Sequence, residues 1–285
     1  MNLPAWYVCA FGAGTILALL LIHRLLHRFV LQRRSLKGDL IGENGAYALR
    51  EVGNVLAVFI LGAAIVKNAL RGADPKVDAI WCAAYGVLGL VLFELTSHLG
   101  LRFLLRGRLA ASLERGNVAA GLAAASHYVA MGILTSRAVA GQDLRGLGLS
   151  VTFFALAVAS QQLVLISFRA LTTYDDAEQI DGENTAAALS YSGVSLAVAL
   201  VIARALEGDF PGWELALKGF ASLVACTAAL YPLRQIIVQG VVLGARPALR
   251  GGALDLAIGR DRKLGIAALE AACYLGSALA FVSLA

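Results

Sequence analysis

Residues 113–138, LERGNVAAGLAAASHYVAMGILTSRA, carry a pattern that returns elsewhere in the chain. A short polar start that ends in Asn opens an apolar run rich in small residues. The copies are residues 41–66 (IGENGAYALREVGNVLAVFILGAAIV), residues 180–205 (IDGENTAAALSYSGVSLAVALVIARA) and, without the Asn, residues 259–284 (GRDRKLGIAALEAACYLGSALAFVSL). Each apolar run is close to the ~20 residues that cross a bilayer as a helix. The pattern therefore predicts a membrane protein in which one helical unit occurs four times.

The composition agrees with this class. The chain is 59% hydrophobic and 15% charged, whereas soluble domains are about 45–50% apolar and about 25% charged. Inside a bilayer, where no water is available, a single segment can form all of its backbone hydrogen bonds only as an α-helix. We predict an all-α polytopic membrane protein, with residues 1–285 forming a single integral membrane domain and repeats at about 1–72, 73–143, 144–210 and 211–285. The eight expected spans are 6–30, 45–66, 77–104, 116–138, 147–171, 185–206, 213–243 and 264–284.

Basic residues are unevenly shared between the two sides of the expected membrane. Of the 24 Lys and Arg residues, 15 lie in or beside the loops after the odd-numbered spans: Arg24, Arg28, Arg33, Arg34, Lys37, Arg102, Arg106, Arg108, Arg115, Arg169, Arg246, Arg250, Arg260, Arg262 and Lys263. Six lie in or beside the other loops: Lys67, Arg71, Lys76, Arg137, Arg145 and Arg204. Because cytoplasmic loops carry the excess of Lys and Arg, we expect the odd loops in the cytoplasm and both termini outside it. This distribution excludes a nucleic-acid partner as the reason for the net charge of +5.

The copies align on a small set of positions. Asn44, Asn117 and Asn184 coincide, and Leu264 stands in that column of the fourth copy. The even-numbered helices are rich in Ala, Gly and Ser, which let helix backbones approach closely in lipid. We therefore expect the even helices at the centre and the odd helices facing lipid. A two-span unit keeps its orientation when it is copied, so the repeats are parallel and not inverted.

Residues 113–134, LERGNVAAGLAAASHYVAMGIL, resemble the signature of the YjfL family, domain of unknown function 350. The unit of that family is a pair of transmembrane helices, and its second helix opens with a Gly-Asn-x-Ala start, here Gly116, Asn117 and Ala119. The match is partial in the first and third units and poor in the fourth. The resemblance implies a location in the bacterial inner membrane, and it carries over no activity and no functional residue.

Ionisable residues inside membrane spans are costly and are candidates for function. Glu94 and His98 are four residues apart and share one face of the third span, His127 lies in the middle of the fourth, and Gln161 and Gln162 lie in the fifth. Such a set could relay protons or bind a metal or a cationic solute. The plainer interpretation is a group of hydrogen bonds between helices.

Two other sets of polar residues have a structural and a functional interpretation. If the even helices surround an axis, Arg50 and Glu270 meet as an ion pair between repeats; otherwise each side chain extends to the cytoplasmic surface. Asn44, Asn117 and Asn184 are good helix N-caps. Together they could also form a ring that receives an anion at the cytoplasmic side.

No motif of an enzyme, a metal site or a cofactor site is present. His23 and His27 are one helical turn apart like a metal-binding pair, but their place at the cytoplasmic boundary favours an interfacial role, so we predict neither metal nor cofactor. We expect a protein that is not an enzyme and that functions as a channel or transporter for an ion or small solute. The alternative is a membrane scaffold, related to the envelope or to stress, whose basic loops recruit a cytosolic partner. The expected partners are the lipid bilayer and either a second copy or a peripheral cytosolic protein.

Overall fold

The computed structural model describes residues 3–30, 44–141, 143–208 and 210–284. Within these residues all regular structure is helical, and eight helices are long and apolar enough to cross a membrane. The prediction of an all-helical, multi-pass fold is confirmed. Arg33, Arg34 and Lys37, which contributed to the expected topology, lie outside the described residues.

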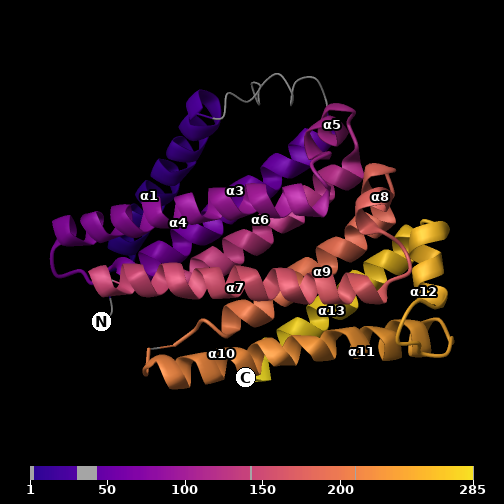
Figure 1. Ribbon diagram of the computed structural model, residues 1–285. Coiled ribbons are helices and arrows are strands. Elements are labelled where there is room, and N and C mark those ends of the chain that lie inside the picture. Colours follow the sequence, from indigo (N-terminus) through magenta and orange to yellow (C-terminus); the bar gives the residue numbers. More distant parts are fainter. Residues whose placement is uncertain (1–2, 31–43, 142, 209, 285) are drawn as a thin grey trace.

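The spans form an inner and an outer set (Figure 1). The inner helices are α3 (Gly45–Ala69), α6 (Val118–Ala138), α9 (Thr185–Arg204) and α13 (Leu264–Leu284). The outer helices are α1 (Ala5–Leu25, continued by the π-helix η1, Leu26–Val30), α4 (Pro75–Leu104) and α7 (Leu144–Leu171). The seventh span is also an outer one, and it joins α10 (Trp213–Cys226), the 3-10 turn η2 (Thr227–Ala229), α11 (Leu230–Arg234) and the π-helix η3 (Gln235–Val242). Short helices α5 (Leu109–Glu114), α8 (Asp176–Asp181) and α12 (Ala253–Asp255) are spread along the end of the molecule where the inner helices begin, and η4 (Leu256–Arg260) directly follows α12.

The inner helices form an open row in chain order. α3 packs against α6, α6 against α9, and α9 against α13, while α3 and α13 stand at the two ends. α4 contacts both α3 and α6, and α7 contacts both α6 and α9, so the outer helices follow the same order. The small-residue helices are central, as predicted, but they do not surround an axis. α6 and α9, in the middle of the row, are the most buried spans.

Glycine makes this close packing feasible. A Cβ placed on Gly121 of α6 would lie 2.7 Å from Ala46 Cα of α3, and one on Gly132 would lie 2.7 Å from Ala57 Cα. At the next interface, a Cβ on Gly193 of α9 would lie 2.6 Å from the Cβ of its α13 neighbour. Real Cβ atoms do not approach so closely, so the backbones are in direct contact here. This is the packing that small residues permit in membranes.

The inner helices α3, α6 and α9 each begin with an Asn that also binds the next repeat. The side-chain oxygens of Asn44, Asn117 and Asn184 accept backbone N–H groups of their own first turns. Their amide nitrogens donate to carbonyl oxygens just before the next inner helix: Asn44 to Leu113 at 2.9 Å, Asn117 to Ile180 at 2.8 Å and Asn184 to Ile258 at 2.9 Å. Asn alone among the best cap residues supplies an acceptor and an amide donor together. Leu264, in the Asn column of the fourth repeat, has no side-chain donor or acceptor for either of these bonds.

This double role predicts an unusual order of stability among variants of Asn117, which is 1% exposed. Asn117→Ala loses the cap and the bond to the next repeat, at a cost of roughly 2 kcal/mol. Asn117→Asp keeps the cap oxygen but turns a second oxygen towards the Ile180 carbonyl, so it should cost at least as much. Capping alone predicts the opposite, because Asp caps helices as well as Asn and suits the helix dipole.

Thermal unfolding of the detergent-purified protein measures this order. Asp143→Asn is the control, because Asp143 caps α7 through a single acceptor bond to Gly146, and the change should be nearly neutral. An Asn117→Asp variant as stable as the wild type would show that the bond to the next repeat contributes nothing.

Candidate functional site

A buried carboxylate and three imidazoles meet between α1 and α4. Glu94 of α4 accepts hydrogen bonds from His23 Nδ1 and from His27 Nε2, the latter at 3.1 and 3.2 Å from its two oxygens. His98 places Nδ1 3.5 Å from the other Glu94 oxygen and donates to the Glu94 carbonyl at 2.8 Å. Three of the four histidines in the chain thus surround one carboxylate. We refer to His23, His27, Glu94 and His98 as the carboxylate–imidazole cluster.

Helical spacing on two neighbouring helices builds this cluster. His23 and His27 are one turn apart on α1–η1, and Glu94 and His98 are one turn apart on α4, so each pair projects from one face. The chain changes from α to π geometry at Leu26, and π-turns in membrane and soluble helices often occur at functional sites. The sequence identified both pairs but not their meeting. His23 is only 4% exposed, so its ring packs inside the protein against Glu94, and its interfacial depth stays a prediction.

His127 lies outside the cluster, contrary to the grouping that the sequence suggested. Its ring packs against Gly100 of α4, at a place that a Cβ would fill, and its Nδ1 lies 3.4 Å from the Tyr191 hydroxyl of α9. Gly100 follows Glu94 by six residues, about one and two-thirds helical turns, so the two positions face different neighbours. His127 therefore belongs to the α4–α6–α9 packing.

Gln161 and Gln162 are also separate from the cluster. Gln161 is fully buried and donates a long hydrogen bond, 3.4 Å, to the Ser195 carbonyl of α9. Gln162 is half-buried on the same helix. Both residues lie on α7, which packs on α6 and α9 and shares no extensive contact with α1. Of the five residues proposed for an intramembrane polar site, the structure brings together Glu94 and His98.

A second buried charged group lies in the other half of the chain. Arg234 of α11 is fully buried and forms ion pairs with Asp255 of α12, at 2.8 Å, and with Glu270 of α13. Pro232 cannot donate a backbone hydrogen bond, and the span changes from α to π geometry directly after Arg234. This group holds its own cation, the guanidinium, between two carboxylates.

The expected ion pair between Arg50 and Glu270 is not formed. Arg50 pairs with its neighbour Glu51, and Glu270 pairs with Arg234. The physical reason is the open row: Arg50 is on α3 and Glu270 on α13, at opposite ends. The prediction assumed a closed ring of inner helices, in which the fourth repeat packs against the first.

Ion pairs outside the spans connect the basic loop of the second repeat to α8. Arg108 and Arg115 bind Asp181 at 3.2 and 2.8 Å, and Ser112 donates to the same carboxylate at 2.7 Å. Hydrogen bonds from Ser112 and Arg115 hold the pKa of Asp181 below its usual value. Burial instead raises the pKa of Asp176 to about 6, although Arg169 at 2.8 Å opposes this shift.

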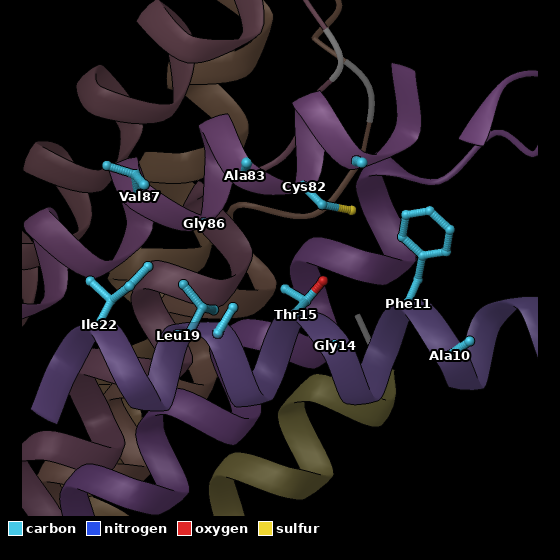
Figure 2. Close-up of a pocket in the computed structure, with 12 residues that line it drawn as sticks. Ala10, Phe11, Gly14, Thr15, Leu19, Ile22, Cys82, Ala83, Gly86 and Val87 are labelled. Carbon is cyan, nitrogen blue, oxygen red and sulfur yellow. The ribbon is translucent and has the colours of Figure 1, made fainter. Parts of the chain in front are cut away.

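An apolar groove of about 450 Å³ runs between α1 and α4 beside the cluster (Figure 2). Phe11, Leu19 and Ile22 of α1 face Cys82 and Val87 of α4 across it. The groove ends at Ile22, which directly precedes His23. A second groove, of about 510 Å³, lies between α7 and the seventh span. The polar cluster is therefore bordered by an apolar surface on the side away from the inner-helix starts.

The geometry defines a multi-pass helical membrane protein with a buried carboxylate–imidazole cluster between two outer helices. The chain belongs to the DUF350 family, described as a Domain of Unknown Function, because the sequence model of this family matches residues 2–139 and again residues 142–284. Each match covers four of the eight spans. No curated protein and no solved structure matches the chain.

Proposed function

We propose that this protein moves a cation across the bacterial inner membrane and that the carboxylate–imidazole cluster is its binding site. The observation that carries this proposal is the burial of Glu94 between two spanning helices with imidazoles of three histidines facing it. Ionisable groups at membrane depth are expensive and typically mark ion or proton pathways. A carboxylate surrounded by imidazoles offers a cation both charge and lone pairs.

The distribution of Lys and Arg favours access from the cytoplasm. With the odd loops cytoplasmic, both termini are outside, and the cluster lies near the cytoplasmic ends of α1 and α4. Side-chain exposure rises in that direction, from 5% for His23 to 13% for His27 and 26% for His98. We infer that a cation reaches Glu94 past His27 and His98.

Release to the other side requires a movement, and α1 is the best candidate for the moving element. The N-terminal ends of α1 and α4, far from the cluster, are joined by a hydrogen bond of 2.8 Å from the Tyr7 hydroxyl to Asp78. The groove between the two helices is apolar. α1 is the least buried span, and of its described side chains only Leu19 and His23 are buried. Tilting of α1 away from α4 would open the cluster, and α1 would then move along its contact with the inner helix α3.

A scaffold that recruits a cytosolic protein is the alternative function. Its candidate basic residues include Arg106 and Arg108, which form ion pairs with Asp175 and Asp181 of the same chain. Arg33 and Arg34 lie outside the described residues. Nothing in the described part of the chain favours the scaffold over cation transfer, and recruitment of a second copy or a peripheral protein stays a prediction.

Proteoliposomes test the transport proposal. Purified full-length protein is reconstituted, and uptake of H⁺, K⁺ and Zn²⁺ is followed with dyes enclosed in the vesicles. We expect uptake of at least one of these cations and a loss of tenfold or more in Glu94→Gln. Glu214→Gln is the matched control, because Glu214 undergoes the same chemical change at an exposed position. Absence of uptake for all three cations, or equal uptake by Glu94→Gln, contradicts the proposal.

A further inference from the structure

We infer that His23, His27 and Glu94 form a binding site for a divalent transition metal of the Zn²⁺ type. This inference rests on the proposed cation-binding function and names the class of cation. The ligand atoms of the three residues lie within 4.8 Å of one another. They come from two helices, α1–η1 and α4, that run side by side.

The donor set selects the class of metal. Two imidazole nitrogens and a carboxylate are ligands of Zn²⁺, Fe²⁺ and related ions, whereas Mg²⁺ and Ca²⁺ prefer oxygen alone. A zinc site with two His and one acidic ligand has an open fourth position for water or a transported group. No cysteine is needed, and Cys82, in the apolar groove, lies three helical turns before Glu94 on α4.

The distances are those of a site that needs little rearrangement. Zn–N and Zn–O bonds of about 2.0–2.2 Å separate tetrahedral ligand atoms by roughly 3.4 Å. His27 Nε2 already lies 3.1 and 3.2 Å from the two Glu94 oxygens. The His23 and His27 rings are 4.3 Å apart between centroids. Their i, i+4 spacing is the one that paired histidines use to hold zinc on a single helix.

His98 acts as a positioning residue for this site. Its Nδ1 donates to the Glu94 carbonyl and lies 3.5 Å from the carboxylate, and its ring is edge-on to His27 at 5.9 Å. Groups around metal ligands fix their orientation, and their loss typically lowers metal affinity about 10–100-fold. We expect His98→Ala to weaken binding without abolishing it.

Metal titration of the full-length protein in detergent tests the inference. After treatment with a chelator, we expect the wild type to bind one Zn²⁺ per chain and to take up Co²⁺ with the visible absorption of a nitrogen- and oxygen-coordinated ion. His23→Ala, His27→Ala and Glu94→Gln should each weaken Zn²⁺ binding about 100-fold or more. His127→Gln is the matched control, because His127 is a buried histidine outside the cluster, and it should bind normally.

A variant that folds poorly can still be tested by thermal unfolding with and without Zn²⁺, because the difference between the two unfolding temperatures reports binding to the folded state. Zn²⁺ should raise the unfolding temperature of the wild type and of His127→Gln, and leave that of Glu94→Gln unchanged. No stoichiometric binding by the wild type, or equal binding by all three ligand variants, overturns the metal site. Binding without Zn²⁺ uptake by vesicles supports the site and contradicts transport. Glu94-dependent uptake of H⁺ or K⁺ without Zn²⁺ binding supports transport and overturns the metal site.

Discussion

Replacement of Arg234 by methionine is expected to destabilise the protein by roughly 3–5 kcal/mol. Arg234 is fully buried, its guanidinium lies between Asp255 and Glu270, and both carboxylates are also buried. Methionine fills a similar volume but leaves two buried carboxylates without a counter-charge, and an uncompensated buried charge is the costly outcome of breaking such a pair. Thermal unfolding and the monodisperse fraction on size-exclusion chromatography measure the loss.

A second variant separates charge from shape at this position. Arg234→Met combined with Glu270→Gln removes one carboxylate charge together with the guanidinium, so it should recover part of the lost stability. Arg260→Met is the matched control, because Arg260 pairs with Asp261 at an exposed site, and its loss should change the stability little. A double variant less stable than Arg234→Met alone is incompatible with this account of the ion pairs.

Replacement of Gly121 by leucine should separate α3 from α6 and prevent stable folding. A Cβ at Gly121 would lie 2.7 Å from Ala46 Cα and 2.5 Å from its carbonyl oxygen. Backbone cannot rotate away as a side chain can, so the helices must move apart along the interface. Even Gly121→Ala should cost roughly 1–3 kcal/mol, the range for overpacking a well-packed core.

Gly219→Ala and Gly219→Leu are the matched controls, because no atom lies within 4 Å of a Cβ placed on Gly219 of α10. In a helix, Gly→Ala at an open position stabilises by up to about 1 kcal/mol through propensity. The sign of the Ala effect should therefore differ between the two glycines. Unfolding temperatures that change alike at Gly121 and Gly219 would show that the close helix contact is absent.

The repeat pattern and the apolar runs were sufficient to predict the fold class, the eight spans and the central place of the small-residue helices. Apolar runs and small-residue content are properties of each segment by itself, so they can be read directly from the sequence. The open row was not predicted, because parallel repeats can form a ring or a row with the same local pattern. The wrong pairing of Arg50 with Glu270 follows from that single missing fact.

The candidate site was predicted only in part for a similar reason. The spacing of Glu94 and His98, and that of His23 and His27, is visible in the sequence, but which face of α1 meets α4 depends on helix rotation and on the π-turn at Leu26. His127 was grouped with Glu94 by depth alone. A comparison of i, i+4 polar pairs between neighbouring odd helices would have suggested the cluster, since both pairs lie near the C-terminal ends of their spans.

The role of the Asn column also needed the structure. The sequence predicts a helix cap, and the loss of Asn at Leu264 then looks like decay of the last copy. The bonds from Asn44, Asn117 and Asn184 to the following repeat show that each of these residues also joins two neighbouring repeats. Only the position of the next repeat shows this second function.

X-ray absorption at the zinc edge of the Zn²⁺-loaded, full-length protein tests most directly whether α1 and α4 hold a cation between them. We predict a first shell of nitrogen and oxygen at about 2.0–2.1 Å, with outer-shell scattering from two imidazoles that falls to one in His23→Ala and is unchanged in His127→Gln. A spectrum of hydrated zinc, or imidazole scattering that His23→Ala leaves intact, would contradict the account.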